Sequence, residues 1–173
     1  IVFSLKYMTA YTGLPKYYSL FMLMVAGMNG VVVSGDLCVI AASQGGLVLA
    51  DVSDPASPGF LSRAQTPYPV AGCAYIASDS LAFAAIGTPG VSVYDVSDVA
   101  NPVFQSNGQG GFSRDVVTRE VAPGDHHEVF AADGYGMKTQ ECYWYEGLST
   151  WFFRQATDAG GMGVARGICL HGN

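Results

Sequence analysis

The sequence predicts an all-β protein assembled from repeated units of four short antiparallel strands. One basis for this prediction is an internal repeat: the eight residues Asp51–Pro58 recur 44 positions later as Asp95–Pro102, with six identities. The other is the distribution of 22 Gly and 8 Pro, which separate short apolar runs along the 173 residues and are typical of turns between strands. A period in the forties with four strands per unit predicts a β-propeller, in which each unit forms one blade.

A second marker supports the same period. The pattern Pro-x-aromatic-x-Ser begins at Pro15, Pro58 and Pro102, and the copies are 43 and 44 residues apart. In the first complete unit we expect four strands, near residues 29–34, 37–42, 46–52 and 59–64. Gly, Asp and Pro residues between these runs favour turns, and such a unit buries its faces only against neighbouring units.

The repeat divides the chain into one continuous propeller segment, residues 1–173. We expect a partial blade at 1–25, blades at about 26–66, 67–110 and 111–160, and a partial blade at 161–173. This amounts to about 3.5 blades, whereas closed propellers have roughly four to eight. We therefore expect the chain to be part of a larger propeller.

Both ends of the chain contain apolar runs that we interpret as strands. Residues 2–7 are expected to form the last strand before the first marker, and residues 165–170 the innermost strand of a further blade. The run at 17–27 is interpreted as an outer blade strand, and a signal-peptide hydrophobic region is the alternative. This run is too short to cross a bilayer, so we expect no transmembrane segment.

Composition and charge limit the classes of partner. Half of the residues are apolar and 13% are charged, which argues against a disordered chain. The 14 Asp and Glu residues outnumber the 8 Lys and Arg residues, for a net charge of −6. This sign opposes binding to a phosphate backbone, and we expect no nucleic-acid partner.

The four cysteines do not form a zinc-ribbon motif, because no two of them are separated by two residues. Cys38, Cys73 and Cys169 lie in apolar runs, where a small buried side chain is typical. A disulfide between Cys73 and either Cys38 or Cys142 is the alternative, and the sequence does not choose between them.

One cluster has side chains that bind metals, namely Asp125-His-His-Glu128, together with Cys142 and His171. Adjacent residues on a strand point to opposite faces, so we interpret the cluster as an exposed hairpin. The chain contains no Gly-x-Ser-x-Gly elbow and no phosphate-binding loop. We assign no catalytic residue, no metal site and no cofactor.

The paired carboxylates of the repeat have two interpretations. Asp51 with Asp54, and Asp95 with Asp98, suit calcium because hard cations prefer oxygen ligands. A motif present once per unit at a strand end is more simply a turn held by side-chain to backbone hydrogen bonds. We therefore predict that these residues are structural.

The segments Val31–Asp36 and Gly46–Pro55 closely resemble the LVIVD repeat of secreted or cell-surface propellers of bacteria and archaea. In the third unit, Val129–Met137 resembles the second strand and following hairpin of that repeat, whereas Glu141–Glu146 departs from it. The resemblance implies an extracellular or cell-surface location.

The resemblance also places an arginine before the innermost strand of a blade, at the channel mouth. Arg114 and Arg166 hold this position, and we select them as the candidate binding residues. Their alternative role is to bond carbonyl groups or an aspartate of a neighbouring blade.

These features favour a noncatalytic extracellular interaction module that binds a protein or a glycan through its loops or its channel mouth. The first alternative is a metal-dependent hydrolase or lactonase-like propeller enzyme. The second is a structural unit that self-associates through the open edges of its terminal blades.

Overall fold

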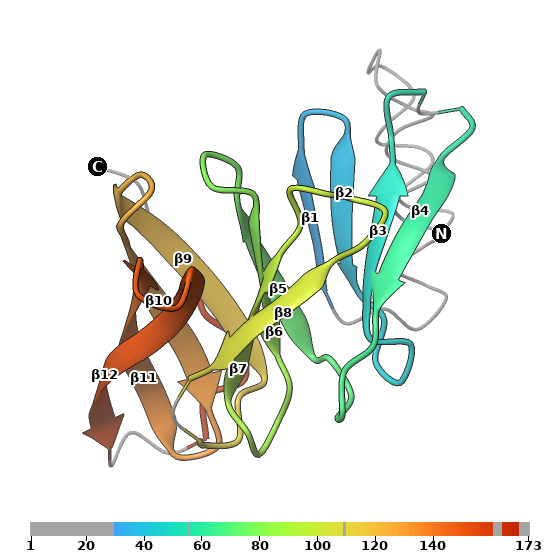
Figure 1. Ribbon diagram of the computed structural model, residues 1–173. Helices are drawn as coiled ribbons and strands as arrows, with labels where there is room; N and C mark the ends of the chain where they lie inside the picture. Colours follow the sequence, from blue (N-terminus) through green and yellow to red (C-terminus); the bar gives the residue numbers. More distant parts are fainter. Residues whose placement is uncertain (1–29, 55, 109, 161–163, 170–173) are drawn as a thin grey trace.

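A computed structural model of the protein describes residues 30–54, 56–108, 110–160 and 164–169. This part of the chain forms three four-stranded antiparallel sheets that stand side by side, and it contains no helix (Figure 1). The all-β propeller architecture predicted from the repeat is therefore confirmed. The expected strand at 2–7, the apolar run at 17–27 and the first copy of the marker lie outside the described residues.

Each sheet is a simple meander, in which strands that follow one another in the sequence are neighbours. Blade 1 consists of β1 (Gly30–Ser34), β2 (Leu37–Ala41), β3 (Leu47–Asp51) and β4 (Gly59–Ala64). Blade 2 consists of β5 (Gly72–Ile76), β6 (Leu81–Ala85), β7 (Val91–Asp95) and β8 (Val103–Asn107). Blade 3 consists of β9 (Asp115–Ala122), β10 (His126–Asp133), β11 (Gly136–Tyr145) and β12 (Thr150–Gly160). The strands expected in the first complete unit agree with those of blade 1 to within one residue at each end.

The first strand of each blade is the innermost one. Strand β5 packs against β1 on one side and against β9 on the other. The close approach of β5 and β9 depends on Gly72, where an added Cβ would lie 2.6 Å from Oδ1 and 2.9 Å from Cα of Asp115. The first strands of the three blades therefore lie side by side, with β5 between β1 and β9.

The hydrophobic core lies between the blades, and the alternation of side chains along β6 shows why. Ala82 and Ala84 face blade 1 and pack with residues such as Leu49. Leu81 and Phe83, on the opposite face of the same strand, pack with residues of blade 3. Because both of its faces are covered, β6 is buried at every position, and neighbouring blades depend on one another for stability.

The repeated Asp-Val-Ser-Asp segments form turns held by their own side chains. The Oδ1 atom of Asp51 accepts a hydrogen bond of 2.8 Å from the Ser53 amide, and Asp95 Oδ1 accepts one of 2.8 Å from Ser97. Asp98 Oδ1 similarly accepts the amide of Ala100 at 3.0 Å. Such bonds are Asx turns, which is the hydrogen bonding that the structural interpretation of these aspartates predicts.

Blade 3 departs from the repeat at its outer strands. The segment 141–146, where the repeat would place the turn, instead continues β11 as far as Tyr145. In blade 1 the marker serine, Ser62, donates a hydrogen bond to the Val99 carbonyl in the β7–β8 turn of blade 2. The hydroxyl of its counterpart Ser106 is buried and has no hydrogen-bond partner among the described residues.

The C-terminal prediction is wrong in one respect: residues 164–169 do not form a strand. This segment is held instead by two isolated hydrogen bonds, from the Ala165 amide to the Asp133 carbonyl at 3.1 Å and from the Ile168 amide to Asp115 Oδ2 at 3.2 Å. Among the described residues it has no hydrogen-bonded ladder that would define a strand.

The prediction for the cysteines also needs correction. Cys169 is exposed rather than packed in a core, whereas Cys142 on β11 is fully buried. All four cysteines are free thiols. Within the described part of the chain, no helix has the length and apolar character needed to cross a bilayer.

Candidate functional site

The two ends of the blades differ in how the chain turns there. In an antiparallel meander, successive turns alternate between the two ends of the sheet. The turns after the first and third strands of each blade lie at one end, which we call the acidic end. The opposite end contains the turns after the second strands and the linkers that join one blade to the next, and we call it the linker end.

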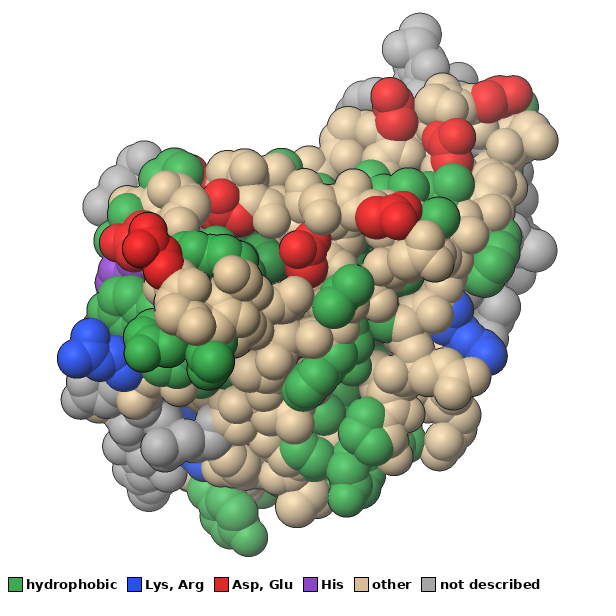
Figure 2. Space-filling model, in the orientation of Figure 1, with side chains coloured by type: hydrophobic (Ala, Val, Ile, Leu, Met, Phe, Trp, Pro, Cys, Tyr) green, Lys and Arg blue, Asp and Glu red, His purple; other side chains and the backbone are tan. Residues whose placement is uncertain are grey.

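Charge separates these ends. The acidic end carries eight carboxylates and no Lys or Arg in its turns: Asp36, Asp51, Asp54, Asp79, Asp95, Asp98, Asp125 and Glu146. Figure 2 shows acidic side chains gathered along the upper part of the molecule, where these turns lie in Figure 1. Arg63, Arg114 and Arg166, all exposed, lie at or near the linker end, where two carboxylates also occur, the buried Asp133 and the partly buried Asp115. An anionic partner is therefore favoured at the linker end.

Arg114 directly precedes β9, whereas Arg166 lies in the segment 164–169, which forms no strand. The residue before each arginine donates its amide to a carbonyl of the preceding blade: Ser113 to Gly87 in the β6–β7 turn and Ala165 to Asp133 at the end of β10, both at 3.1 Å. Both arginine side chains are exposed. Arg114 lies over the ring of Phe112, with 5.2 Å between its Cζ atom and the ring centroid, and no carboxylate of the described residues forms an ion pair with it.

Arg114 lies on the rim of a cavity of about 260 Å³, which we call the junction cavity. The linkers before and after blade 2 and the β6–β7 turn form this cavity. Its wall is largely apolar and includes Tyr68, Pro69, Ile86 and Phe112. Tyr68 and Phe112 are each 48% exposed, so about half of each aromatic side chain is available to a partner. Exposed aromatic side chains beside an arginine are typical of the residues that dominate protein–protein binding.

Ser113 also lines the junction cavity and is only 1% exposed. Both of its backbone groups bond Gly87, at 3.1 Å each, but its hydroxyl has no hydrogen-bond partner among the described residues. A buried hydroxyl without a partner costs free energy.

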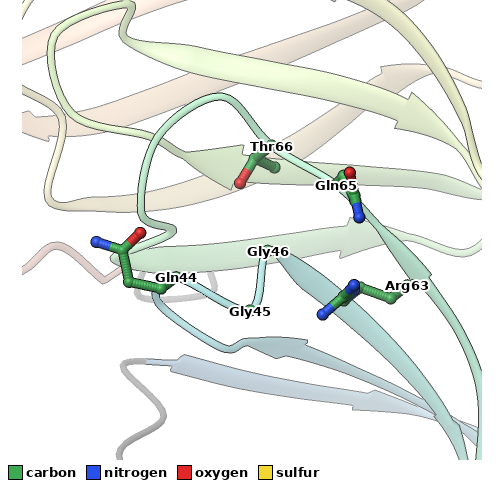
Figure 3. A pocket seen from close by; sticks show the side chains of 6 residues that line it. All are labelled: Gln44, Gly45, Gly46, Arg63, Gln65 and Thr66. Atoms are coloured by element: carbon green, nitrogen blue, oxygen red, sulfur yellow. The ribbon is translucent and has the colours of Figure 1, made fainter.

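A second cavity, of about 230 Å³, lies at the linker end of blade 1, and we call it the blade-1 cavity. Its lining is polar and includes Gln44, Arg63, Gln65 and Thr66. In Figure 3, Arg63 extends from β4 toward the turn at Gly45–Gly46, across the cavity from Gln44. No carboxylate of the described residues forms an ion pair with Arg63.

The structure separates the two histidines of the candidate metal cluster. His126 stacks on Tyr143 with ring centroids 4.2 Å apart, whereas His127 stacks on Trp151 at 4.9 Å. The expected exposed hairpin is wrong for His127, which is fully buried, because the aromatic side chains of blade 3 and a turn of blade 2 cover it. No group of three or more His, Cys, Asp or Glu side chains suited to a metal occurs among the described residues, which exclude His171.

Of the two arginines selected from the sequence, Arg114 lines the junction cavity and Arg166 lines neither cavity. The other lining residues were not selected. Tyr68 and Phe112 lie in linkers without a recurring motif, and Arg63 is an ordinary exposed residue near the end of a strand. One available signal is their location: each aromatic residue lies a few positions before an innermost strand, Tyr68 before β5 and Phe112 before β9.

Together, the three blades and the cavities of the linker end define a β-propeller repeat protein, a fold that supports a protein-interaction module in general. The family model of the LVIVD repeat matches residues 28–66. The chain thus contains an LVIVD repeat, as its sequence predicts.

Comparison with solved structures agrees with this fold. The crystal structure of Sqt1 from Saccharomyces cerevisiae is similar, with a TM-score of 0.56 and 12% sequence identity over 78% of this chain. The match covers 36% of the Sqt1 chain, so this chain spans about a third of that protein. No curated protein matches the sequence. At this identity the likeness concerns the fold alone.

Proposed function

We propose that this propeller is an interaction module that binds a protein partner at its linker end, through the junction cavity and Arg114. The observation that carries the proposal is the junction cavity itself, which combines two half-exposed aromatic side chains, an unpaired arginine and a buried hydroxyl without a partner. At about 260 Å³, it is smaller than the roughly 300–1,000 Å³ of sites that enclose a small-molecule ligand. A single anchoring side chain of a partner suits this volume better.

Variants of the immobilised 173-residue chain test this function. A cell-envelope extract is passed over wild-type protein, over Arg114→Glu and Phe112→Ser, and over the control Arg154→Glu, whose exposed side chain lies on β12 outside both cavities. We expect a partner that wild type and the control retain and that both junction-cavity variants lose. A partner retained equally by all four proteins, at unchanged melting temperatures, contradicts the proposed site.

The location that we propose is the cell surface or the extracellular space. This proposal is supported by the LVIVD repeat at residues 28–66 and by the compartment that the resemblance implies. Protease treatment of intact cells is the direct measurement: a surface protein is digested, whereas an intracellular one is protected until the cells are lysed.

A further inference from the structure

The junction cavity and the blade-1 cavity are neighbours along a short ridge of the linker end. Thr66 lines the blade-1 cavity and Tyr68 lines the junction cavity. Two residues span at most about 7 Å of extended chain, so these lining residues are close in space. The Thr66 hydroxyl donates a hydrogen bond of 2.7 Å to the Tyr68 carbonyl, which holds the ridge between the cavities in one conformation.

The two cavities differ in chemistry in a complementary way. The junction cavity presents mainly carbon atoms to a ligand, while the blade-1 cavity presents the Arg63 guanidinium and the side chains of Gln65 and Thr66. A guanidinium without an acidic partner binds a carboxylate through paired hydrogen bonds. The carboxylates of the turns lie at the opposite end of the blades and do not compete for this position.

We propose that the partner is recognised through a short linear segment that places an apolar side chain in the junction cavity and an acidic side chain beside Arg63. This inference rests on the proposed function, because it names the chemistry of the segment that the same site binds. The ridge at 66–68 then lies beneath the partner's backbone, between the two anchored side chains.

Titration of the ¹⁵N-labelled 173-residue chain with defined peptides tests this inference. The panel consists of short Gly/Ser peptides that contain one Phe and one Glu, in both orders and at different spacings. Matched peptides carry Gln in place of Glu or Ser in place of Phe. The amide signals of Gly45 and Gly46 report on the blade-1 cavity, and those of Ser113 and Arg114 report on the junction cavity.

The best Phe/Glu peptide is expected to shift both sets of signals. Its Gln counterpart should lose the Gly45 and Gly46 shifts and bind about tenfold more weakly, because a hydrogen bond to a charged group is lost. Arg63→Gln should cause the same loss for the Glu peptide and little change for the Gln peptide. Arg154→Gln, outside both cavities, should bind like wild type.

The outcomes separate the two proposals. If the Glu and Gln peptides bind equally while Ser113 and Arg114 still shift, this inference is wrong and the proposed function stands. If no peptide shifts Ser113 or Arg114, both are overturned. If galacturonate shifts Gly45 and Gly46 and no peptide does, the blade-1 cavity is a site for an acidic sugar and the peptide inference is wrong.

Discussion

The Nε2 atom of His127 lies 2.7 Å from Oδ2 of Asp79, so an imidazole on β10 of blade 3 contacts a carboxylate in the β5–β6 turn of blade 2. Asp79 Oδ1 also accepts the amide hydrogen of Gly124 at 2.8 Å, in the β9–β10 turn. One carboxylate thus holds both a buried side chain and a turn of the next blade. This contact adds a polar connection at the acidic end to the apolar core between the two blades.

Burial lowers the pKa of His127 below its ordinary value of 6.5, although Asp79 and Glu120 act in the opposite direction. The unfolded chain therefore binds a proton at a higher pH than the folded chain does. The contribution of His127 to the free energy of unfolding is fully present above about pH 6.5. It is lost as the pH falls toward the lower pKa of the folded state.

We expect the free energy of unfolding of wild type to decrease as the pH falls below about 6.5, and His127→Gln to remove part of this dependence. The measurement is urea unfolding at a series of pH values. His126→Gln is the matched control, since His126 is only partly buried and lies next to His127 on the same strand. Identical pH dependence of wild type and His127→Gln contradicts the assignment.

Asp95→Ala should destabilise the protein by about 1 kcal/mol, because the Ser97 amide loses its acceptor in the Asx turn. Asp95→Asn keeps a side-chain oxygen in place and should lose less. Urea unfolding of the two variants provides the comparison. If calcium raises the midpoint of wild type but not of Asp95→Ala, the turn is a cation site and the structural interpretation is wrong.

Phe83→Ala should cost about 3–5 kcal/mol, since this ring is fully buried in the core between blades 2 and 3 and meets Phe153 edge to face at 6.5 Å. Phe104→Ala on β8 is the control, and it should cost less than about 1 kcal/mol because that ring is 50% exposed. Equal losses for the two variants would show that the two sheets do not pack as described.

The four thiols should differ in their reaction with a thiol reagent under native conditions. Burial raises the pKa of Cys38 to about 11 and those of Cys73 and Cys142 to about 12, so these groups are neutral and shielded at pH 8. Cys169 is exposed and should react first. We expect one fast thiol in native protein and four in denaturant, whereas two or fewer in denaturant without reductant would reveal a disulfide.

The sequence by itself determined the blades and their turns. Asp51 and Asp95 recur at the period of the blade because each makes a turn with residues that directly follow it, and such contacts leave a local pattern in the sequence. The family resemblance selected Arg114 and Arg166 as residues that precede an innermost strand, and Arg114 does directly precede β9.

Only the tertiary structure decided which of these residues meet. Tyr68 and Phe112 come from different linkers and face one cavity because β5 and β9 pack side by side, and Asp79 reaches His127 for the same reason. The repeat did not predict that β11 continues to Tyr145. The register of this strand is fixed by its pairing with β10 and β12 rather than by a turn motif. Contacts between blades depend on the packing of whole sheets against one another, and residues brought together in that way share no spacing along the chain.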